Sequence, residues 1–486
     1  MELAVKLTDV AVTFGNKDIF QIDELTAYQN DRIGIVGGNG QGKSTLLNLI
    51  ADKIQPDRGK IQRETTFTYF SQIALPDEAE TELDGELLGR MKVPTNSITT
   101  LSGGEGSKLR LTQALTNYQL GMLLDEPTTH LDRRSIDVLI EELNYYYGTL
   151  LFVSHDREFL NQLATKIWEV SEGKIREFNG NYDDYQQQKE QERLTQENAF
   201  SHYEQEKNRL AAAAQKKKEQ AARMARVSDK KKKQNIRPGR LSSTKQKDTV
   251  QKAAQKTAKT IEKRLEQLET VQNVAGQRKI IFPPSIALTI HNKFPIMGDR
   301  ITLIKGEKCL LEQASFQFPL GKKIALIGDN GTGKSSLLQY IQENQPGITL
   351  SPKVVFSTYQ QMDYQLHQRE TILSFLMKRT DYSESLVRSL LNNLGFLQTE
   401  LDKSVQKLSG GEATRVSMAL VFVKPANVLI LDEPTNFIDL STVSALERFL
   451  RAYPGTVLFT SHDPYFVKTV ADEVYEIKGK QLKRRC

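Results

Sequence analysis

Short apolar runs recur along this chain, and each is followed by a glycine-rich, acidic or polar segment. The runs RIGIV (residues 32–36) and KIALI (323–327) both lead into a glycine-rich segment and then a helix-like stretch, LLNLI or LLQYI. The runs GMLL and NVLIL end in two carboxylates, and TLLFV and TVLFT end in a serine and a histidine. Short apolar runs bounded by turn signals predict buried strands, and their alternation with helices predicts an α/β fold.

Four motifs occur twice, in the same order, near the two ends of the chain. The first set is GGNGQGKST, LSGGE, LLDEPTTHLD and SHD, and the second is GDNGTGKSS, LSGGE, LILDEPTNFID and SHD. Lys43 and Lys334 lie 291 positions apart, whereas Glu126 and Glu433 lie 307 apart, so the second copy has 16 additional residues between its first two motifs. This repeat predicts a duplicated domain, with a first domain at residues 1–182 and a second domain at residues 281–486.

The segment between the domains, residues 183–280, has the pattern of a helical hairpin. Proline and glycine are absent between GNYDDY and Pro238, which allows a helix from about Asp184 to Ile236, about 80 Å long. Apolar residues follow heptad spacing before the Pro238–Gly239 pair (Tyr203, Leu210, Ala214, Ala221, Met224) and after it (Ala254, Ala258, Ile261, Leu265, Leu268), with Val250 one turn ahead of the second series. One thin apolar stripe on each helix predicts an antiparallel coiled coil with its tip near residues 237–244.

Composition indicates whether the chain is a soluble, a membrane-spanning or a disulfide-rich protein. Of the 486 residues, 26% are charged and 38% hydrophobic, which is typical of a soluble protein of several domains. We find no apolar run of about 18 residues and no signal-peptide pattern at the N-terminus. The two cysteines, Cys309 and Cys486, cannot form a disulfide framework, so we expect a cytoplasmic protein without membrane spans.

Positive charge is concentrated in the middle of the chain. The net charge is +6 overall but +13 between Gln186 and Ile280, so the remainder carries −7. This asymmetry predicts a polyanionic partner, and a basic rod suits RNA phosphates. The candidate RNA-binding residues lie just before and at the predicted tip: Lys230, Lys231, Lys232, Lys233, Arg237, Arg240 and Leu241. The alternative interpretation is a disordered, solvated linker.

Both glycine-rich segments match the phosphate-loop pattern GxxxxGK[ST] between a strand and a helix. Backbone N–H groups at such a helix N-terminus bind phosphates, Lys43 and Lys334 would reach the β- and γ-phosphates, and Ser44 and Ser335 would bind Mg²⁺. The candidate ATP-binding residues here are Gly37, Gly38, Asn39, Gly40, Gln41, Gly42, Lys43, Ser44, Thr45, Gly328, Asp329, Asn330, Gly331, Thr332, Gly333, Lys334, Ser335 and Ser336. The alternative is a glycine-rich turn without a ligand, but two full matches to the GxxxxGK[ST] pattern make that interpretation a poor one.

Paired carboxylates end one buried strand in each domain. Asp125 and Asp432 would lie near Mg²⁺, and successive side chains of a strand point to opposite faces, so Glu126 and Glu433 could instead polarise the attacking water. The alternative is an acidic turn before proline, which is weaker for two copies than for one.

Histidine and glutamine supply further candidates. His155 and His462 follow another apolar strand and could contact the γ-phosphate, although a Ser/Asp helix cap with an incidental histidine is an open alternative. Gln72 and Gln361 end FTYFSQ and FSTYQQ and are candidate Mg²⁺ ligands, with Gln360 as an alternative to Gln361.

The LSGGE motifs, together with DEPT and SHD, resemble the ATP-binding cassette (ABC) family in both end domains. The resemblance implies a head-to-tail pair that holds two ATP molecules, with Mg²⁺, between the phosphate loop of one domain and the LSGGE of the other. The implied contributors from LSGGE are Ser102, Gly103, Gly104, Ser409, Gly410 and Gly411. One composite site would join Lys43 to Ser409 and Gly411, and the other would join Lys334 to Ser102 and Gly104.

The two sites need not be equivalent. Phe14 can stack on adenine in the first, whereas Lys305 takes that place in the second. Phe437 also replaces the histidine of THLD in the second copy. We expect both sites to bind ATP and to hydrolyse it at unequal rates.

Two cassettes in one chain, joined by a long basic linker, are similar to the ABC-F class, and within it to the Msr type of macrolide-resistance proteins, in its D variant. Only 29 positions separate Gln72 from Leu101, too few for the helical arm that ABC-F translation factors carry there, and the Msr type agrees with that. The resemblance implies a monomer that binds the ribosomal exit site, contacts ribosomal RNA and transfer RNA, and promotes drug release through its tip. A translation factor without a resistance role is the main alternative, and a DNA-directed or transporter ATPase is a weaker one.

Overall fold

The computed structural model describes residues 2–15, 17–71, 84–91, 93, 103–129, 131, 133–233, 253, 256–257, 260, 263, 281–283, 289–306, 308–329, 331–359, 369–436 and 438–485. The chain forms two compact units, one from Met1–Tyr185 with Arg278–Cys486 and the other from Gln186–Gln277. The first unit contains both repeats of the α/β domain, and the fold class expected from the sequence is confirmed.

Each domain is built on a six-stranded, mostly parallel sheet with the same strand order. In the first domain the order is β5 (Phe67–Phe70), β6 (Gly121–Asp125), β7 (Thr149–Val153), β3 (Arg32–Gly37), β8 (Lys166–Ser171) and β9 (Lys174–Asn179). In the second it is β14 (Phe356–Tyr359), β15 (Val428–Leu431), β16 (Thr456–Thr460), β12 (Lys323–Ile327), β17 (Glu473–Lys478) and β18 (Gln481–Arg485). Only the last pair of each sheet is antiparallel. Strands β6, β7, β15 and β16 are buried along their whole length, as parallel strands covered on both faces must be.

A second, antiparallel sheet packs over the phosphate-loop helix of each domain. The strands are β2 (Lys17–Tyr28), β1 (Leu3–Phe14) and β4 (Arg58–Arg63), and correspondingly β11 (Lys308–Phe318), β10 (Ile296–Lys305) and β13 (Ile348–Leu350). Helix α1 (Lys43–Ile50) contributes Leu46 and Leu47 to one cluster with Leu7 of β1 and Ile35 of β3. Helix α8 (Lys334–Gln342) has the same role in the second domain. Each phosphate loop therefore joins a helix held between two sheets.

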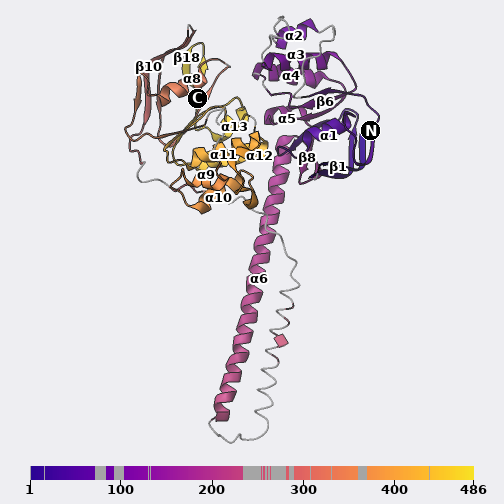
Figure 1. Ribbon diagram of the computed structural model, residues 1–486, viewed down its shortest axis with the longest axis vertical. Coiled ribbons are helices and arrows are strands. Elements are labelled where there is room, and N and C mark those ends of the chain that lie inside the picture. The colour runs from indigo at the N-terminus through magenta and orange to yellow at the C-terminus, as the bar shows by residue number, and fades with distance from the viewer. Residues whose placement is uncertain are drawn as a thin grey trace. The chain divides into compact units, whose positions relative to one another are not determined.

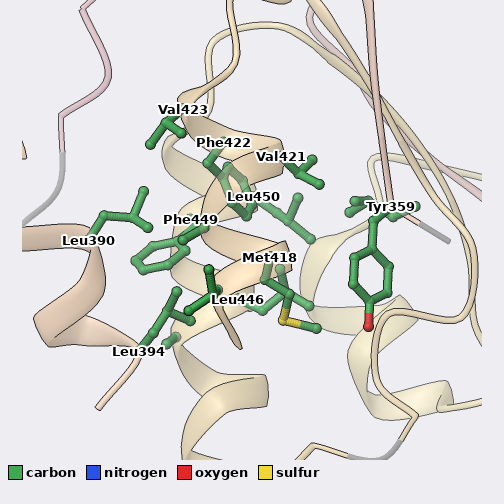
Figure 2. Packing of buried hydrophobic residues seen from close by; sticks show 14 of the residues in the cluster. Tyr359, Leu390, Leu394, Met418, Val421, Phe422, Val423, Leu446, Phe449 and Leu450 are labelled. Atoms are coloured by element: carbon green, nitrogen blue, oxygen red, sulfur yellow. The ribbon is translucent and has the colours of Figure 1, made fainter. Parts of the chain in front are cut away.

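Further helices pack against the parallel sheets or against one another. They are α2 (Gly85–Met91), α3 (Gly103–Thr116), α4 (Arg133–Tyr145) and α5 (Arg157–Leu163) in the first domain, and α9 (Ile372–Met377), α10 (Glu384–Asn393), α11 (Gly410–Val423), α12 (Leu440–Ala452) and α13 (Pro464–Val470) in the second, with short 3₁₀ turns η3 (Gln398–Glu400) and η4 (Val405–Lys407). Figure 2 shows the cluster between α10, α11 and α12, where the Phe422 and Phe449 rings meet edge to face with centroids 5.3 Å apart.

The long helix α6 (Tyr182–Lys233), the magenta helix of Figure 1, begins in the first unit and lies in the second unit from Gln186 onward. Its 52 residues correspond to about 78 Å. Along it, Leu210 and Ala214 are buried and Tyr203 is partly buried, as expected for an apolar stripe. The predicted return helix lies almost entirely outside the described residues, apart from helical positions 253, 256, 257, 260 and 263, and the tip also lies outside them. No helix in the described part of the chain is both long and apolar enough to span a bilayer.

Replacing Phe449 by alanine tests the α11–α12 packing. Phe449 is 1% exposed, so its loss should lower the free energy of unfolding of the second domain by about 3–5 kcal/mol through reduced burial and a residual cavity. Urea unfolding measures the change. Leu397→Ala is the control, because Leu397 is 64% exposed and its truncation should cost no more than about 0.5 kcal/mol. Equal losses for the two variants would contradict this packing.

Candidate ATP sites

The first phosphate loop connects β3 to α1 and tethers its lysine to its own backbone. Lys43 Nζ donates to the carbonyl oxygens of Gly37 (2.9 Å) and Gly38 (3.1 Å), and burial lowers the pKa of Lys43. Gly42 precedes the helix with φ of +99°, and a Cβ there would come within 2.5 Å of Ile19 Cγ2. Only glycine can therefore bring the loop this close to β2 while the ammonium group stays at the helix N-terminus.

The second phosphate loop repeats this arrangement. Lys334 Nζ donates to Gly328 O (2.8 Å) and Asp329 O (3.1 Å), and it lies 3.1 Å from His462 Nε2. Burial also lowers the pKa of Lys334. Asn330 of this loop lies outside the described residues.

The strand-end aspartates lie beside the loop serines. Asp432 Oδ1 accepts hydrogen bonds from Ser335 Oγ (2.9 Å) and Thr460 Oγ1 (2.7 Å). In the first domain burial raises the pKa of Asp125, and a hydrogen bond from Ser44 opposes that rise. These hydroxyl and carboxylate oxygens are the hard ligands that Mg²⁺ accepts, and Mg²⁺ commonly completes its shell with water and nucleotide phosphates. The residues present fit Mg²⁺, and no cluster of three or more ligating side chains occurs in the part of the chain that the structure describes. Gln72, Gln360 and Gln361 lie outside that part.

The two glutamates share an unusual environment. Glu126 and Glu433 have positive φ values of 52° and 47°, a strained conformation for residues other than glycine. The Oε1 atom of each is buried without a hydrogen-bond partner among the described residues. The nearest histidine Nε2 atoms, at 3.3 Å and 3.5 Å, do not form hydrogen bonds with these oxygens. Burial raises the pKa of both carboxyl groups to about 7, the range in which a carboxylate is an effective general base.

The SHD segments cap helices, and each places its histidine beside a phosphate loop. Asp156 accepts hydrogen bonds from the N–H groups of Glu158 and Phe159 and so caps α5, and Asp463 caps α13 in the same way. The preceding histidine also faces a phosphate loop, because His155 Nε2 lies 3.2 Å from Asn39 Oδ1. Burial, reinforced by Lys43, lowers the pKa of His155 to about 3 and keeps the ring neutral.

The first phosphate loop contacts the second domain. Asn39 of the first loop donates its N–H to Asp439 Oδ2 of the second domain (3.2 Å), and its side-chain amide lies 3.8 Å from the position of a Cβ on Gly411. Ser409 caps α11 in a capping box with Glu412. Gly411 of the second LSGGE thus lies beside the loop that carries Lys43. For the other composite site Ser102 lies outside the described residues, while Gly103 and Gly104 begin α3.

A cavity of about 1320 Å³ is lined by phosphate-loop, glutamate and histidine residues of both domains. Its lining includes Lys43, Glu126 and His155 from the first domain and Lys334, Glu433 and His462 from the second. Phe14 and Lys305 also line it, each at the last position of a strand in equivalent hairpins.

Sequence reasoning missed two partners at these sites. Thr460, which hydrogen-bonds Asp432, is part of the apolar run TVLFT and carried no signal of its own. Asp439 ends the DEPTNFID motif, and that repeated position was a usable signal. Burial tends to raise the pKa of Asp439, but hydrogen bonds from Ser441, Thr442 and Asn39 outweigh burial and lower it.

Comparison with known proteins supports the same family in both domains. The family model described as ABC transporter matches residues 20–129 and 311–436. The erythromycin resistance ATP-binding protein MsrA of Staphylococcus epidermidis is 47% identical, with 95% of both chains covered. The ribosome protection protein VmlR of Bacillus subtilis is 32% identical, with 100% of this chain and 88% of that protein covered. Among solved structures, an RNase-L inhibitor matches with a TM-score of 0.63 at 18% identity, covering 98% of this chain and 89% of that chain, and supports the fold alone.

Removing either loop lysine should weaken nucleotide binding. Charge-assisted hydrogen bonds contribute about 1.5–3 kcal/mol, so Lys43→Met and Lys334→Met should each raise the dissociation constant for ATP at their own site by roughly 10- to 100-fold. A fluorescent ATP analogue measures both sites. Lys174→Met, an exposed lysine on β9, should leave binding unchanged. Wild-type affinity in both loop variants would exclude these loops as phosphate sites.

Proposed function

The chain belongs to the ABC-F class of ATP-binding cassette proteins, in its Msr type, and on that premise we propose that it is an ATPase that protects ribosomes from macrolide-class antibiotics. The observation that carries the proposal is the extent of the similarity. Proteins named for erythromycin resistance and for ribosome protection match nearly the whole chain, including the basic segment between the two ATP-binding domains. We assign residues 1–182 and 281–486 to the ATPase domains and residues 183–280 to a linker.

ATP hydrolysis would use the residues of the two sites as follows. The Lys43 and Lys334 ammonium groups and the loop N–H groups hold the phosphates, while Ser44 with Asp125, and Ser335 with Asp432, would hold Mg²⁺. When bound, Mg²⁺ neutralises phosphate charge. Glu126 or Glu433 accepts a proton from the water that attacks the γ-phosphorus, using the carboxylate oxygen that has no other partner.

Neutral histidine completes the hydrolytic arrangement. His155 faces Asn39 of the phosphate loop, and its uncharged ring can position the water or contact the γ-phosphate without repelling Lys43. We assign the same role to His462. Because Gly411 and Asp439 of the second domain approach the loop of the first, bound ATP would favour the closed pair and hydrolysis would release it.

The linker is the part that would contact the ribosome. Helix α6 ends in four consecutive lysines, and residues 186–280 carry a net charge of +13. Such a rod can neutralise RNA phosphates without reading sequence. We propose that it enters the exit site beside transfer RNA in the cytoplasm, and that Arg237, Arg240 and Leu241 at the tip act near the peptidyl-transferase centre to promote drug release. In the alternative function, a translation factor without a resistance role, the same residues would act only on stalled ribosomes.

Glu126→Gln combined with Glu433→Gln tests the ATP cycle. The amide keeps the shape of the site but cannot accept the proton, so hydrolysis should slow by roughly 100-fold or more while ATP binding persists. The variant should remain on ribosomes with ATP, as measured by pelleting, and should fail to restore translation in vitro in the presence of a macrolide. The wild-type protein should restore it. If the wild-type protein rescues ribosomes that stall without drug but does not restore translation inhibited by the macrolide, the alternative function is favoured.

Reversing the charge of Lys230 to Lys233 tests the RNA contact. Replacement by glutamate should weaken ribosome binding more at low salt than at high salt, and should reduce the salt slope by about 0.7–0.9 for each phosphate that the helix no longer neutralises. A matched control reverses Lys216, Lys217 and Lys218, which lie on the same helix about 20 Å nearer its start. If both variants behave alike, the effect is general electrostatic attraction and the lysine run has no local role.

A further inference from the structure

Arg157 forms a buried ion pair between the two domains. It begins α5, two residues after His155, and its side chain is 3% exposed. Its Nη1 donates to Glu447 Oε1 of α12 at 2.6 Å, and its Nη2 donates to Ser444 Oγ at 3.2 Å. The guanidinium also lies over the Tyr465 ring of α13, 5.0 Å from its centroid. Burying two charges is costly, and such pairs are best attested where they specify one arrangement over another.

Helix α12 is thereby attached to the first domain at two points. Its capping residue Asp439 accepts the hydrogen bond from Asn39 in the phosphate loop, and its second attachment is the pair with Arg157. Ser444 and Glu447 lie three positions apart and therefore on the same face of α12. The nucleotide loop and α5 thus hold the same helix of the second domain.

The other end of α5 is attached to the start of the linker helix. Asn161, four positions after Arg157, accepts a hydrogen bond from the Asp183 N–H through its Oδ1 at 2.8 Å. Tyr182, which begins α6, is 1% exposed in the core of the first domain. Tyr465, whose ring lies under the Arg157 guanidinium, has its pKa raised by burial and by the Asp183 carboxylate. Helix α5 therefore follows His155, the candidate for contacting the γ-phosphate. It also contacts the second domain and holds the first turn of α6.

The repeat shows that this junction occurs on one side only. At the offset of 307 residues, Pro464 corresponds to Arg157, Ile140 to Glu447 and Lys468 to Asn161. None of these substitutes can form the same contacts. The junction lies where the linker leaves the first domain, directly after β9, so its asymmetry matches that of the chain.

We propose that Arg157 is a positioning residue that couples closure of the composite site at Lys43 to the first turn of the linker helix. The pair with Glu447 exists only while the domains are closed, so ATP favours it and separation removes it. In the closed state α5 is held from both sides, and the first turn of α6 is fixed through Asn161 and Asp183. This inference rests on the proposed ATP-driven closure and adds the route by which nucleotide state reaches the linker.

Hydrogen exchange at the start of α6 tests the coupling. In the full chain carrying Glu126→Gln and Glu433→Gln, ATP should slow amide exchange of residues 184–190. Adding Arg157→Met should reduce that ATP-dependent slowing by about tenfold, within the 5- to 150-fold range typical of coupled sites. A purely structural contribution would change exchange equally with and without ATP, together with the melting temperature.

Further variants keep the test decisive if Arg157→Met folds poorly. Arg157→Lys keeps the charge but not the forked contact with Ser444 and Glu447, and Glu447→Gln keeps the shape but not the charge, so both should reduce the slowing in the same direction. Combining Arg157→Met with Glu447→Gln should add little to either change alone. The control is Arg388→Met, which removes an exposed pair with Glu384 in α10.

Full ATP-dependent slowing in the Arg157 and Glu447 variants, or an equal loss in the control, overturns the inference. The measurement needs no ribosome, so it is independent of ribosome protection. If coupling is observed but the protein does not bind ribosomes, only the proposed function fails.

Discussion

The structure depends on holding positive charge at two buried helix N-termini. Lys43 and Lys334 are deprived of water, and burial weakens their hold on a proton, yet each is tethered to two loop carbonyls beside nearby carboxylates. That arrangement requires a loop without side chains at its closest approach, a helix held between two sheets, and strands that end together at one sheet edge. An ATP phosphate would add further negative charge at each lysine, and the two domains repeat the same loop, helix and strand ends around it.

The two domains share a strand order and differ at particular residues around it. Both have a strained glutamate with an unpartnered oxygen, a neutralising lysine and an aspartate-capped helix after the histidine. The differences lie around this common centre. Phe14 in one hairpin corresponds to Lys305 in the other, and Arg157 corresponds to Pro464. The contacts of Arg157 thus lie beside the domain from which the linker helix α6 begins.

Much of the site could be predicted because its motifs are local. GxxxxGK[ST] specifies a loop between a strand and a helix within about ten residues, and the repeat removed the ambiguity that a single match leaves. The position of the histidine could not be decided in this way, since Asp156 caps α5 while the neighbouring His155 faces the phosphate loop. The heptad stripe predicted the burial of Leu210 and Ala214, because period alone decides which face of a helix is apolar.

The sequence by itself determined the duplicated α/β fold, the two phosphate loops, the paired carboxylates and the basic linker, because each depends on spacing along a short stretch of chain. Only the tertiary structure decided which distant groups meet. Asn39 reaches Asp439, and Arg157 reaches Glu447 and Ser444, across about 300 to 400 positions. Such contacts depend on how two folded surfaces pack, and no periodicity in the chain encodes them. The environment of Glu126 and Glu433 was likewise decided by burial, which converts ordinary carboxylates into groups with a pKa of about 7.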